Sequence, residues 1–167
     1  CALGAEYKGT KIGNQADITV FSHHPRKFIT TGEGGTITTN NDEWAAWMDS
    51  YKHFGMGASP NREGTVFTRI GSNYKLSNIL AAVGLGQMYH IDDLLGRRTA
   101  LAENYLTLLK DVPGIDIPPT TPGGKHSYQS FCIFVQDRDR IMQEMRAKGI
   151  EVQIGTYALH MHPAFAE

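Results

Sequence analysis

Two short segments that favour β structure flank Lys27. This arrangement, two strands joined by a connection that carries the lysine, is the strongest constraint that the sequence places on the fold. Residues 17–21 (Asp-Ile-Thr-Val-Phe) precede the lysine and residues 35–40 (Gly-Thr-Ile-Thr-Thr-Asn) follow it. Runs of β-branched residues bounded by turn residues predict two strands, so Lys27 lies in their connection. Burial there would disfavour the charged form of the lysine, and a neutral amine is what attack on a carbonyl carbon requires. The alternative is a plain β-hairpin with a solvated lysine, because most lysines are exposed.

Composition describes an ordinary globular chain and excludes several classes of protein. The chain has 167 residues, 41% of them hydrophobic, and a net charge of −1. It is long enough for a domain-sized core, and its charge gives no reason to expect nucleic acid or an anionic membrane as partner. Two widely separated cysteines predict neither a disulfide framework nor a metal motif, and they favour a reducing cytoplasm. No apolar run approaches the ~20 residues that span a bilayer.

The connection around the lysine also carries a recognisable sequence pattern. Residues 21–35 read Phe-Ser-His-His-Pro-Arg-Lys-Phe-Ile-Thr-Thr-Gly-Glu-Gly-Gly. This run resembles the pattern F-S-F-x-P-x-K-x-[ILMV]-T-x-G-E-G-G of the DegT/DnrJ/EryC1/StrS family of pyridoxal-phosphate-dependent sugar aminotransferases, with His23 where that family usually has phenylalanine. Residues 2–13, 71–88 and 149–163 resemble further family segments in the same order. The resemblance therefore extends over nearly the whole chain.

The resemblance implies an α/β chain, part of an aspartate aminotransferase-like fold. Residues 1–110 are expected to form part of the large pyridoxal-phosphate-binding domain, including its long connecting helix. Residues 111–167 are expected to form part of the small C-terminal α+β domain. Compared with the family, a large part of the protein is expected before Cys1 and a smaller part after Glu167. The groups that pair with the ring nitrogen of the cofactor and stack on its ring would precede Cys1.

Three residues resemble the cofactor-binding groups of the family. Lys27 resembles the lysine that holds pyridoxal 5'-phosphate as an internal aldimine and later moves a proton between cofactor and substrate carbons. Ser22 resembles the serine that binds the cofactor phosphate, although a strand-end hydroxyl bonded to backbone would also explain it. Asn73 resembles the asparagine that reaches the same phosphate from the partner subunit, although Asn is also common in turns. The resemblance thus implies a homodimer with shared active sites.

Two residues near the C-terminus resemble the substrate side of the family site. Tyr157 and His160 match a segment that approaches the sugar nucleotide; a structural tyrosine and a surface histidine would explain them almost equally well. His160 and His162 predict no metal site, because only Glu167 offers a nearby carboxylate.

The implied reaction transfers an amino group from an amino acid, glutamate in our interpretation, to a nucleotide-linked keto-sugar. One alternative is a pyridoxal-phosphate-dependent sugar dehydratase or another diverged member of the family. A dehydrating relative replaces the lysine with histidine, so Lys27 favours transamination, whereas His23 keeps the alternative open. The other alternative is a non-catalytic remnant or regulatory protein of the same fold.

Local signals predict the helices. Asn41 is a candidate N-cap for a helix over residues 42–53 that Gly55 could end. Trp44 and Trp47 share one face of that helix and are expected in the core. Ser77 is expected to begin one long helical stretch that reaches about Lys110. Further elements are expected over residues 128–135 (strand), 137–148 (helix) and 150–154 (strand).

Overall fold

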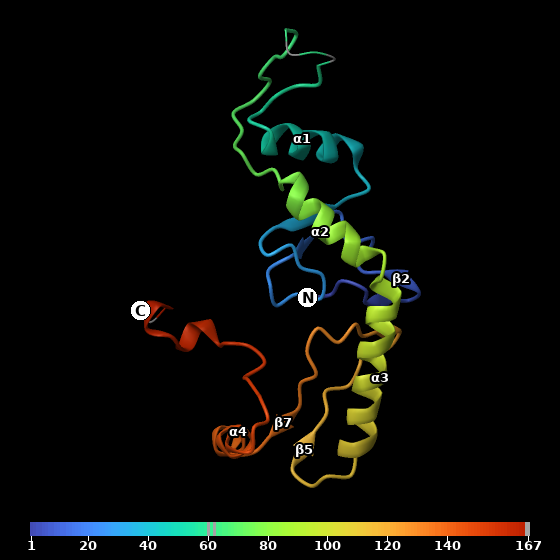
Figure 1. Ribbon diagram of the computed structural model, residues 1–167, viewed down its shortest axis with the longest axis vertical. Coiled ribbons are helices and arrows are strands. Elements are labelled where there is room, and N and C mark those ends of the chain that lie inside the picture. Colours follow the sequence, from blue (N-terminus) through green and yellow to red (C-terminus); the bar gives the residue numbers. More distant parts are fainter. Residues whose placement is uncertain (60, 62, 166–167) are drawn as a thin grey trace. The chain divides into compact units, whose positions relative to one another are not determined.

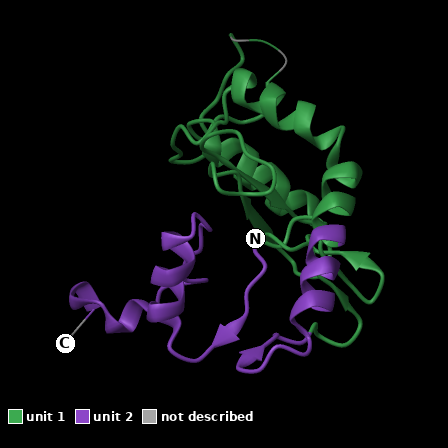
Figure 2. Ribbon diagram, turned by 60° about the horizontal axis from the view of Figure 1, so that its bottom comes forward, with its two compact units in different colours: residues 1–99, 120–129 green, residues 100–119, 130–167 purple. Residues whose placement is uncertain are grey.

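The computed structural model describes residues 1–59, 61 and 63–165. Two compact units make up the chain, and each is described by itself (Figure 2). The first unit comprises residues 1–99 and 120–129, and the second comprises residues 100–119 and 130–167. Within the described residues, no helix has the length and apolar character needed to cross a membrane.

The predicted pair of strands around Lys27 is confirmed. Strand β3 (Thr19–Ser22) runs antiparallel to β4 (Gly35–Thr38), with Phe21 opposite Thr36 and Val20 opposite Ile37. Because side chains alternate between the faces of a strand, Phe21 lies on a different face from Val20 and Ile37. Phe21 is buried, whereas Val20 and Ile37 are exposed. Residues 23–34, here called the lysine connection, join the two strands.

A second sheet in the first unit is formed by three very short strands. Strand β1 (Glu6–Tyr7) lies between β2 (Thr10–Lys11) and β6 (Gly124–Lys125), and both neighbours are antiparallel to it. Residues 120–129 thus return to the first unit after the chain has entered the second.

Helix α1 (Asp42–Lys52) begins where its cap predicts. The side chain of Asn41 accepts a hydrogen bond from the Trp44 N–H at 3.0 Å, and the Gly55 N–H bonds the Ser50 carbonyl after the helix ends. The prediction that both tryptophans lie in the core is wrong, because Trp44 is 40% and Trp47 49% exposed. No residue of α1 is buried, and its most covered residues, Met48, Ser50 and Tyr51, are half-buried.

The single long helix predicted after Ser77 is two helices, α2 (Asn78–Met88) and α3 (Ile91–Leu109), which follow one another in Figure 1. The Ser77 cap is confirmed, since its hydroxyl accepts a hydrogen bond from the Leu80 N–H. The helix divides where the His90 N–H bonds the carbonyl of Gln87, three residues back. Such tighter turns are common at helix ends.

Among its described residues, the second unit contains the C-terminal part of α3, one strand pair, one further α-helix and two short 3₁₀ helices. Strand β5 (Ile115–Asp116) pairs with β7 (Phe134–Val135), which is all that forms of the strand expected over residues 128–135. Helix α4 (Arg138–Ala147) is confirmed, and the Gly149 N–H bonds Arg146 where it ends. The strand expected over 150–154 does not form, because no described strand pairs with it. The 3₁₀ helices are η1 (Leu159–Met161) and η2 (Pro163–Phe165).

Candidate active site

Lys27 lies in a small hollow of the first unit. The hollow lies at the end of β3, where the lysine connection begins, and Lys27 itself is half-buried. It is lined by Cys1, Leu3, Phe21, Ser22, Lys27, Phe28, Ile29 and Gln129. Two of the predicted site residues, Ser22 and Lys27, are therefore together. We call this site the Lys27 hollow.

The amine of Lys27 has a close polar neighbour in the hollow. Its Nζ atom donates to the Sγ atom of Cys1 at 3.0 Å. Its backbone N–H donates to the His24 carbonyl at 2.8 Å, which closes a tight turn through Pro25 and Arg26. The side chain is thus presented from a turn in the backbone and not from a regular strand.

Ser22 closes β3 and places its hydroxyl at the start of the lysine connection. The Oγ atom accepts a hydrogen bond from the His24 N–H at 3.3 Å, which is the bond expected of a strand-end serine. A serine hydroxyl keeps its own O–H as a donor while it accepts such a bond. The structure therefore leaves Ser22 able to donate to an anion in the Lys27 hollow.

The lysine connection is anchored by buried side chains and by bonds across itself. Phe28, Ile29 and Thr31 are all buried, Ile29 almost completely. The Thr31 N–H donates to the His23 carbonyl at 3.1 Å, and the His23 N–H donates to the Gly34 carbonyl at 2.9 Å. These bonds fold the connection back on itself, so that Lys27 is carried on an ordered support.

His23, which departs from the family pattern, is buried within this support. Its Nε2 atom lies 2.6 Å from the Thr36 hydroxyl, and its Nδ1 atom lies 3.4 Å from the Ile29 carbonyl oxygen. Both ring nitrogens thus have partners in the lysine connection and β4. His23 therefore serves the local structure.

Two glutamines that the sequence analysis did not single out as site residues bond the lysine connection. Gln129 bonds the backbone beside Lys27, and Gln87 bonds the backbone at Thr30. Gln129 is separated from Phe28 by 101 positions, and Gln87 from Thr30 by 57. Gln87 lies in residues 71–88, which resemble a family segment, but the sequence predicted no contact of either glutamine with the lysine connection, because only the fold brings these segments together.

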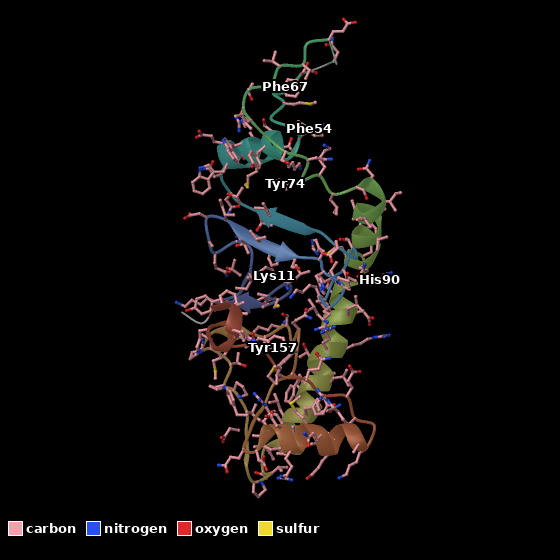
Figure 3. The ribbon with its side chains drawn as sticks, turned by 90° about the vertical axis from the view of Figure 1, so that its left-hand side faces the viewer. Lys11, Phe54, Phe67, Tyr74, His90 and Tyr157 are labelled. Carbon is pink, nitrogen blue, oxygen red and sulfur yellow. The ribbon has the colours of Figure 1, made fainter. Side chains whose placement is uncertain are left out.

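Asn73 lies outside the set of residues that line the Lys27 hollow. It is exposed and forms an isolated antiparallel bridge with His53, just after helix α1. The neighbouring Tyr74, labelled in Figure 3, has its ring 6.0 Å from that of Tyr51. Within one chain, Asn73 therefore belongs to the surface next to α1.

Tyr157 and His160 belong to the second unit. Tyr157 is 64% exposed, and its ring meets that of His162 edge-on at 5.9 Å. His160 is exposed within η1. Their relation to Lys27 remains a prediction.

The Lys27 hollow fits pyridoxal phosphate by its chemistry. It offers a primary amine for an aldehyde, a hydroxyl donor for a phosphate oxygen, and apolar side chains such as Phe21 and Phe28 for a flat ring. Within the described ranges, no group of three or more His, Cys, Asp or Glu residues is placed to hold a metal ion.

Curated relatives of known name resemble the chain along its full length. It is 34% identical to GDP-perosamine synthase of Caulobacter vibrioides over 171 residues, which cover 99% of this chain and 45% of that protein. It is 32% identical to dTDP-3-amino-3,4,6-trideoxy-alpha-D-glucose transaminase of Streptomyces venezuelae, covering 99% of this chain and 43% of the relative. The chain thus spans less than half the length of these relatives.

Solved structures share its fold. DesV of Streptomyces venezuelae, solved with a ketimine intermediate, has a TM-score of 0.87 and 30% identity over 98% of this chain and 44% of its own. The putative sugar aminotransferase Spr1654 of Streptococcus pneumoniae, in its PLP form, has a TM-score of 0.86 and 26% identity over 98% of this chain and 44% of its own. The predicted α/β, aspartate aminotransferase-like fold is confirmed. The profile of the DegT/DnrJ/EryC1/StrS aminotransferase family matches residues 1–167, and the chain belongs to that family.

Proposed function

We propose that the protein is a pyridoxal-phosphate-dependent aminotransferase that moves an amino group from an amino acid, glutamate in our proposal, to a nucleotide-linked keto-sugar. The observation that carries this proposal is the meeting of the Lys27 amine and the Ser22 hydroxyl in one hollow of a chain from this family. The names of its relatives, among them transaminases acting on dTDP- and UDP-linked sugars, support the substrate class.

The residues of the Lys27 hollow have different proposed roles in holding the cofactor and in transferring the proton. The cofactor, when bound, supplies the electron sink, and the protein supplies orientation and proton transfer. Lys27 would hold the cofactor through its Nζ atom, and the same atom, when free of the cofactor, would hold and move the proton. The Ser22 hydroxyl donates to the phosphate. Phe21 and Phe28 exclude water from the ring.

The homodimer with shared active sites is part of the proposal. Asn73 is exposed on the surface next to α1, where it would serve the phosphate of the partner subunit. The chain exposes 12,890 Å², whereas a folded protein of its mass exposes about 8,200 Å², and two separate bodies of the same total mass about 10,000 Å². This excess supports the view that more protein covers the chain.

The second unit supplies the proposed substrate side. We assign Tyr157 and His160 to contacts with the sugar nucleotide and retain residues 1–110 and 111–167 as parts of the large and small domains. Cys1 and Cys132 are both free and exposed. Such thiols persist in the reducing cytoplasm, which we propose as the location.

Reductive trapping tests the proposal directly. The full-length protein is incubated with pyridoxal phosphate, reduced with borohydride and mapped by peptide. We expect the adduct on Lys27, its loss in Lys27→Ala, and its retention in Lys52→Ala, a control on the exposed side of α1. A folded wild-type dimer without an adduct at Lys27 would overturn the proposal in favour of a non-catalytic protein.

A second measurement separates transamination from dehydration. Isotopically labelled amino nitrogen is followed from glutamate into the sugar product. We expect the label in the product, because Lys27 is present where a dehydrating relative has histidine. Loss of a hydroxyl group from the sugar without transfer of the label would instead identify a dehydratase.

A further inference from the structure

We propose that Gln129 and Gln87 are positioning residues that fix the backbone on which Lys27 is carried. This inference rests on the proposed function, because it concerns the lysine that carries the covalent chemistry there. Each glutamine uses both ends of its side-chain amide on the lysine connection. Together they hold the backbone from Arg26 to Thr30.

The side chain of Gln129 forms hydrogen bonds with the two peptide groups on either side of Lys27. Its Oε1 atom accepts the Phe28 N–H at 2.8 Å, and its Nε2 atom donates to the Arg26 carbonyl at 2.5 Å. A primary amide carries an acceptor and a donor side by side, so it pairs with this stretch much as a neighbouring strand would. Rotation of the backbone at Lys27 would break at least one of the two bonds.

Helix α3 fixes Gln129 in turn. The Nη1 atom of Arg98 donates to the carbonyls of Tyr128 and Gln129, at 3.0 and 3.2 Å. The guanidinium carbon of Arg98 lies 5.0 Å from the centre of the Phe28 ring. Arg98 thus connects both Gln129 and Phe28 to helix α3. We call the two bonds of Gln129 to the lysine connection the first clamp. The adjacent Arg97 instead forms an exposed ion pair with Asp93.

Gln87 forms the second clamp, from helix α2. Its Oε1 atom accepts the Thr30 N–H at 3.1 Å, and its Nε2 atom donates to the Thr30 carbonyl at 2.6 Å. The same Nε2 atom also donates to the Val83 carbonyl within α2, at 3.0 Å. The amide of Gln87 is therefore anchored to its own helix while it bonds the lysine connection.

The bonds of the two glutamines supply hydrogen-bond partners to backbone groups that lie outside the regular strands. Backbone N–H and C=O groups that are removed from water require partners, and β3 ends before the lysine connection while β4 begins after it. Phe28 and Ile29 are buried between the two clamps, so the segment is held by apolar packing and by side-chain amides together. A small rotation at Lys27 would be magnified along its four-carbon side chain. Misplacement of a reacting group by ~1 Å can cost about 100-fold in rate.

Matched glutamine substitutions in the full-length protein test the proposal. Methionine has a similar length and no amide, so Gln129→Met and Gln87→Met each remove one clamp, and Gln143→Met on the exposed side of α4 is the control. Hydrogen exchange is measured first, without cofactor. We expect faster exchange of the Phe28 amide in Gln129→Met and of the Thr30 amide in Gln87→Met, with no change in Gln143→Met.

The second readout is the rate at which Lys27 is trapped by pyridoxal phosphate and borohydride. We expect Gln129→Met to lower it about 10- to 100-fold, to lower kcat similarly, and to leave the KM for the sugar nucleotide nearly unchanged. Unchanged exchange at Phe28, or faster exchange with unchanged trapping, would overturn the proposed positioning role. Wild-type protein without an adduct at Lys27 would overturn the proposed function instead, and the exchange data would still decide whether the clamp exists.

A milder pair of variants covers the case in which Gln129→Met does not fold. Arg98→Lys weakens the support of Gln129 at a residue that does not itself line the Lys27 hollow. Arg97→Lys is the control, because Arg97 instead forms an exposed ion pair with Asp93. We expect Arg98→Lys to speed exchange at Phe28 and to slow trapping, and Arg97→Lys to do neither. Equal behaviour of the two arginine variants would contradict the proposal.

Discussion

Gly84 of helix α2 lies directly against Thr31 of the lysine connection. A Cβ atom added at Gly84 would lie 2.9 Å from Thr31 Cγ2. Thr31 is buried and its β-branched side chain has little rotamer freedom, so it cannot easily move aside. Alanine favours helix over glycine by ~1 kcal/mol. We nevertheless expect Gly84→Ala to lower the free energy of unfolding, because the contact that brings α2 to the lysine connection would be strained.

Gly86 provides the matched control within the same helix. No described atom lies within 4 Å of a Cβ atom added there, so Gly86→Ala should gain up to ~1 kcal/mol from helix propensity alone. Denaturant unfolding of both variants measures the difference. Equal stabilisation by the two substitutions would show that α2 does not approach Thr31 closely.

The thiol of Cys1 offers a way to obstruct Lys27 without mutation. The Sγ atom lies 3.0 Å from Lys27 Nζ. Alkylation with N-ethylmaleimide would place a bulky group against the amine, so we expect trapping of pyridoxal phosphate at Lys27 to fall to near background. The measurement is peptide mapping of the borohydride-reduced adduct before and after alkylation.

Cys132 supplies the control for this chemistry. It is also free and exposed, and it lies in the second unit. The Cys1→Ser variant should keep its adduct after alkylation, whereas Cys132→Ser should lose it as the wild type does. Loss of the adduct in alkylated Cys1→Ser would assign the effect to another site.

Helix ends could be predicted from neighbouring residues in the sequence. The features that the sequence did not predict depend on contacts between distant residues. Asn41 and Gly149 mark the ends of helices through bonds to residues a few positions away, so neighbouring residues contain the information. The exposure of Trp47 depends on what covers α1. The role of Gln129 depends on a contact across about a hundred positions. Neither can be deduced from adjacent residues, because each depends on distant parts of the fold.

The Lys27 hollow shows the same division. The strand pair could be predicted from the residues on either side of Lys27, and the family resemblance from the lysine connection itself. The two glutamines that bond it come from α2 and from residue 129, and their contacts join segments 57 and 101 positions apart. The supports of the site thus became apparent only from the three-dimensional contacts.

Acid should weaken one ion pair in the three-stranded sheet. Glu6 Oε1 lies 2.6 Å from Lys11 Nζ and 4.0 Å from Lys125 Nζ. The hydrogen bond from Lys11 lowers the pKa of Glu6 below 4.5, with smaller effects from the charges of Lys11 and Lys125. A lowered carboxyl pKa contributes stability above the unfolded-state pKa, and this contribution is lost as the pH falls through the lowered folded-state pKa.

Two lysine variants separate these causes. We expect Lys11→Met to raise the pKa of Glu6 towards 4.5, because methionine can donate no hydrogen bond to the carboxylate, and Lys125→Met to raise it less. An NMR titration of the Glu6 carboxyl carbon measures both. A larger rise in Lys125→Met would mean that the more distant charge of Lys125, and not the hydrogen bond from Lys11, controls the pKa of Glu6.

His23 and Thr36 form a pair whose coupling can be measured. A carbonyl oxygen only accepts hydrogen bonds, so in a neutral ring His23 Nδ1 donates to the Ile29 carbonyl and Nε2, 2.6 Å from the Thr36 hydroxyl, accepts from it. His23→Phe restores the aromatic residue usual in the family pattern but leaves the hydroxyl without this partner, at a cost of about 1 kcal/mol. Thr36→Val should recover most of that loss in the His23→Phe background, as measured by denaturant unfolding of the four proteins.

The same variant also bears on the chemistry. If His23 serves only the local structure, His23→Phe should keep both the adduct at Lys27 and the transfer of labelled nitrogen from glutamate, because the histidine ring is committed to Thr36 and Ile29. Additive effects of the two substitutions would contradict the coupling. Loss of nitrogen transfer from a stable His23→Phe protein would give His23 a part in the reaction and would revive the interpretation of the chain as a diverged family member.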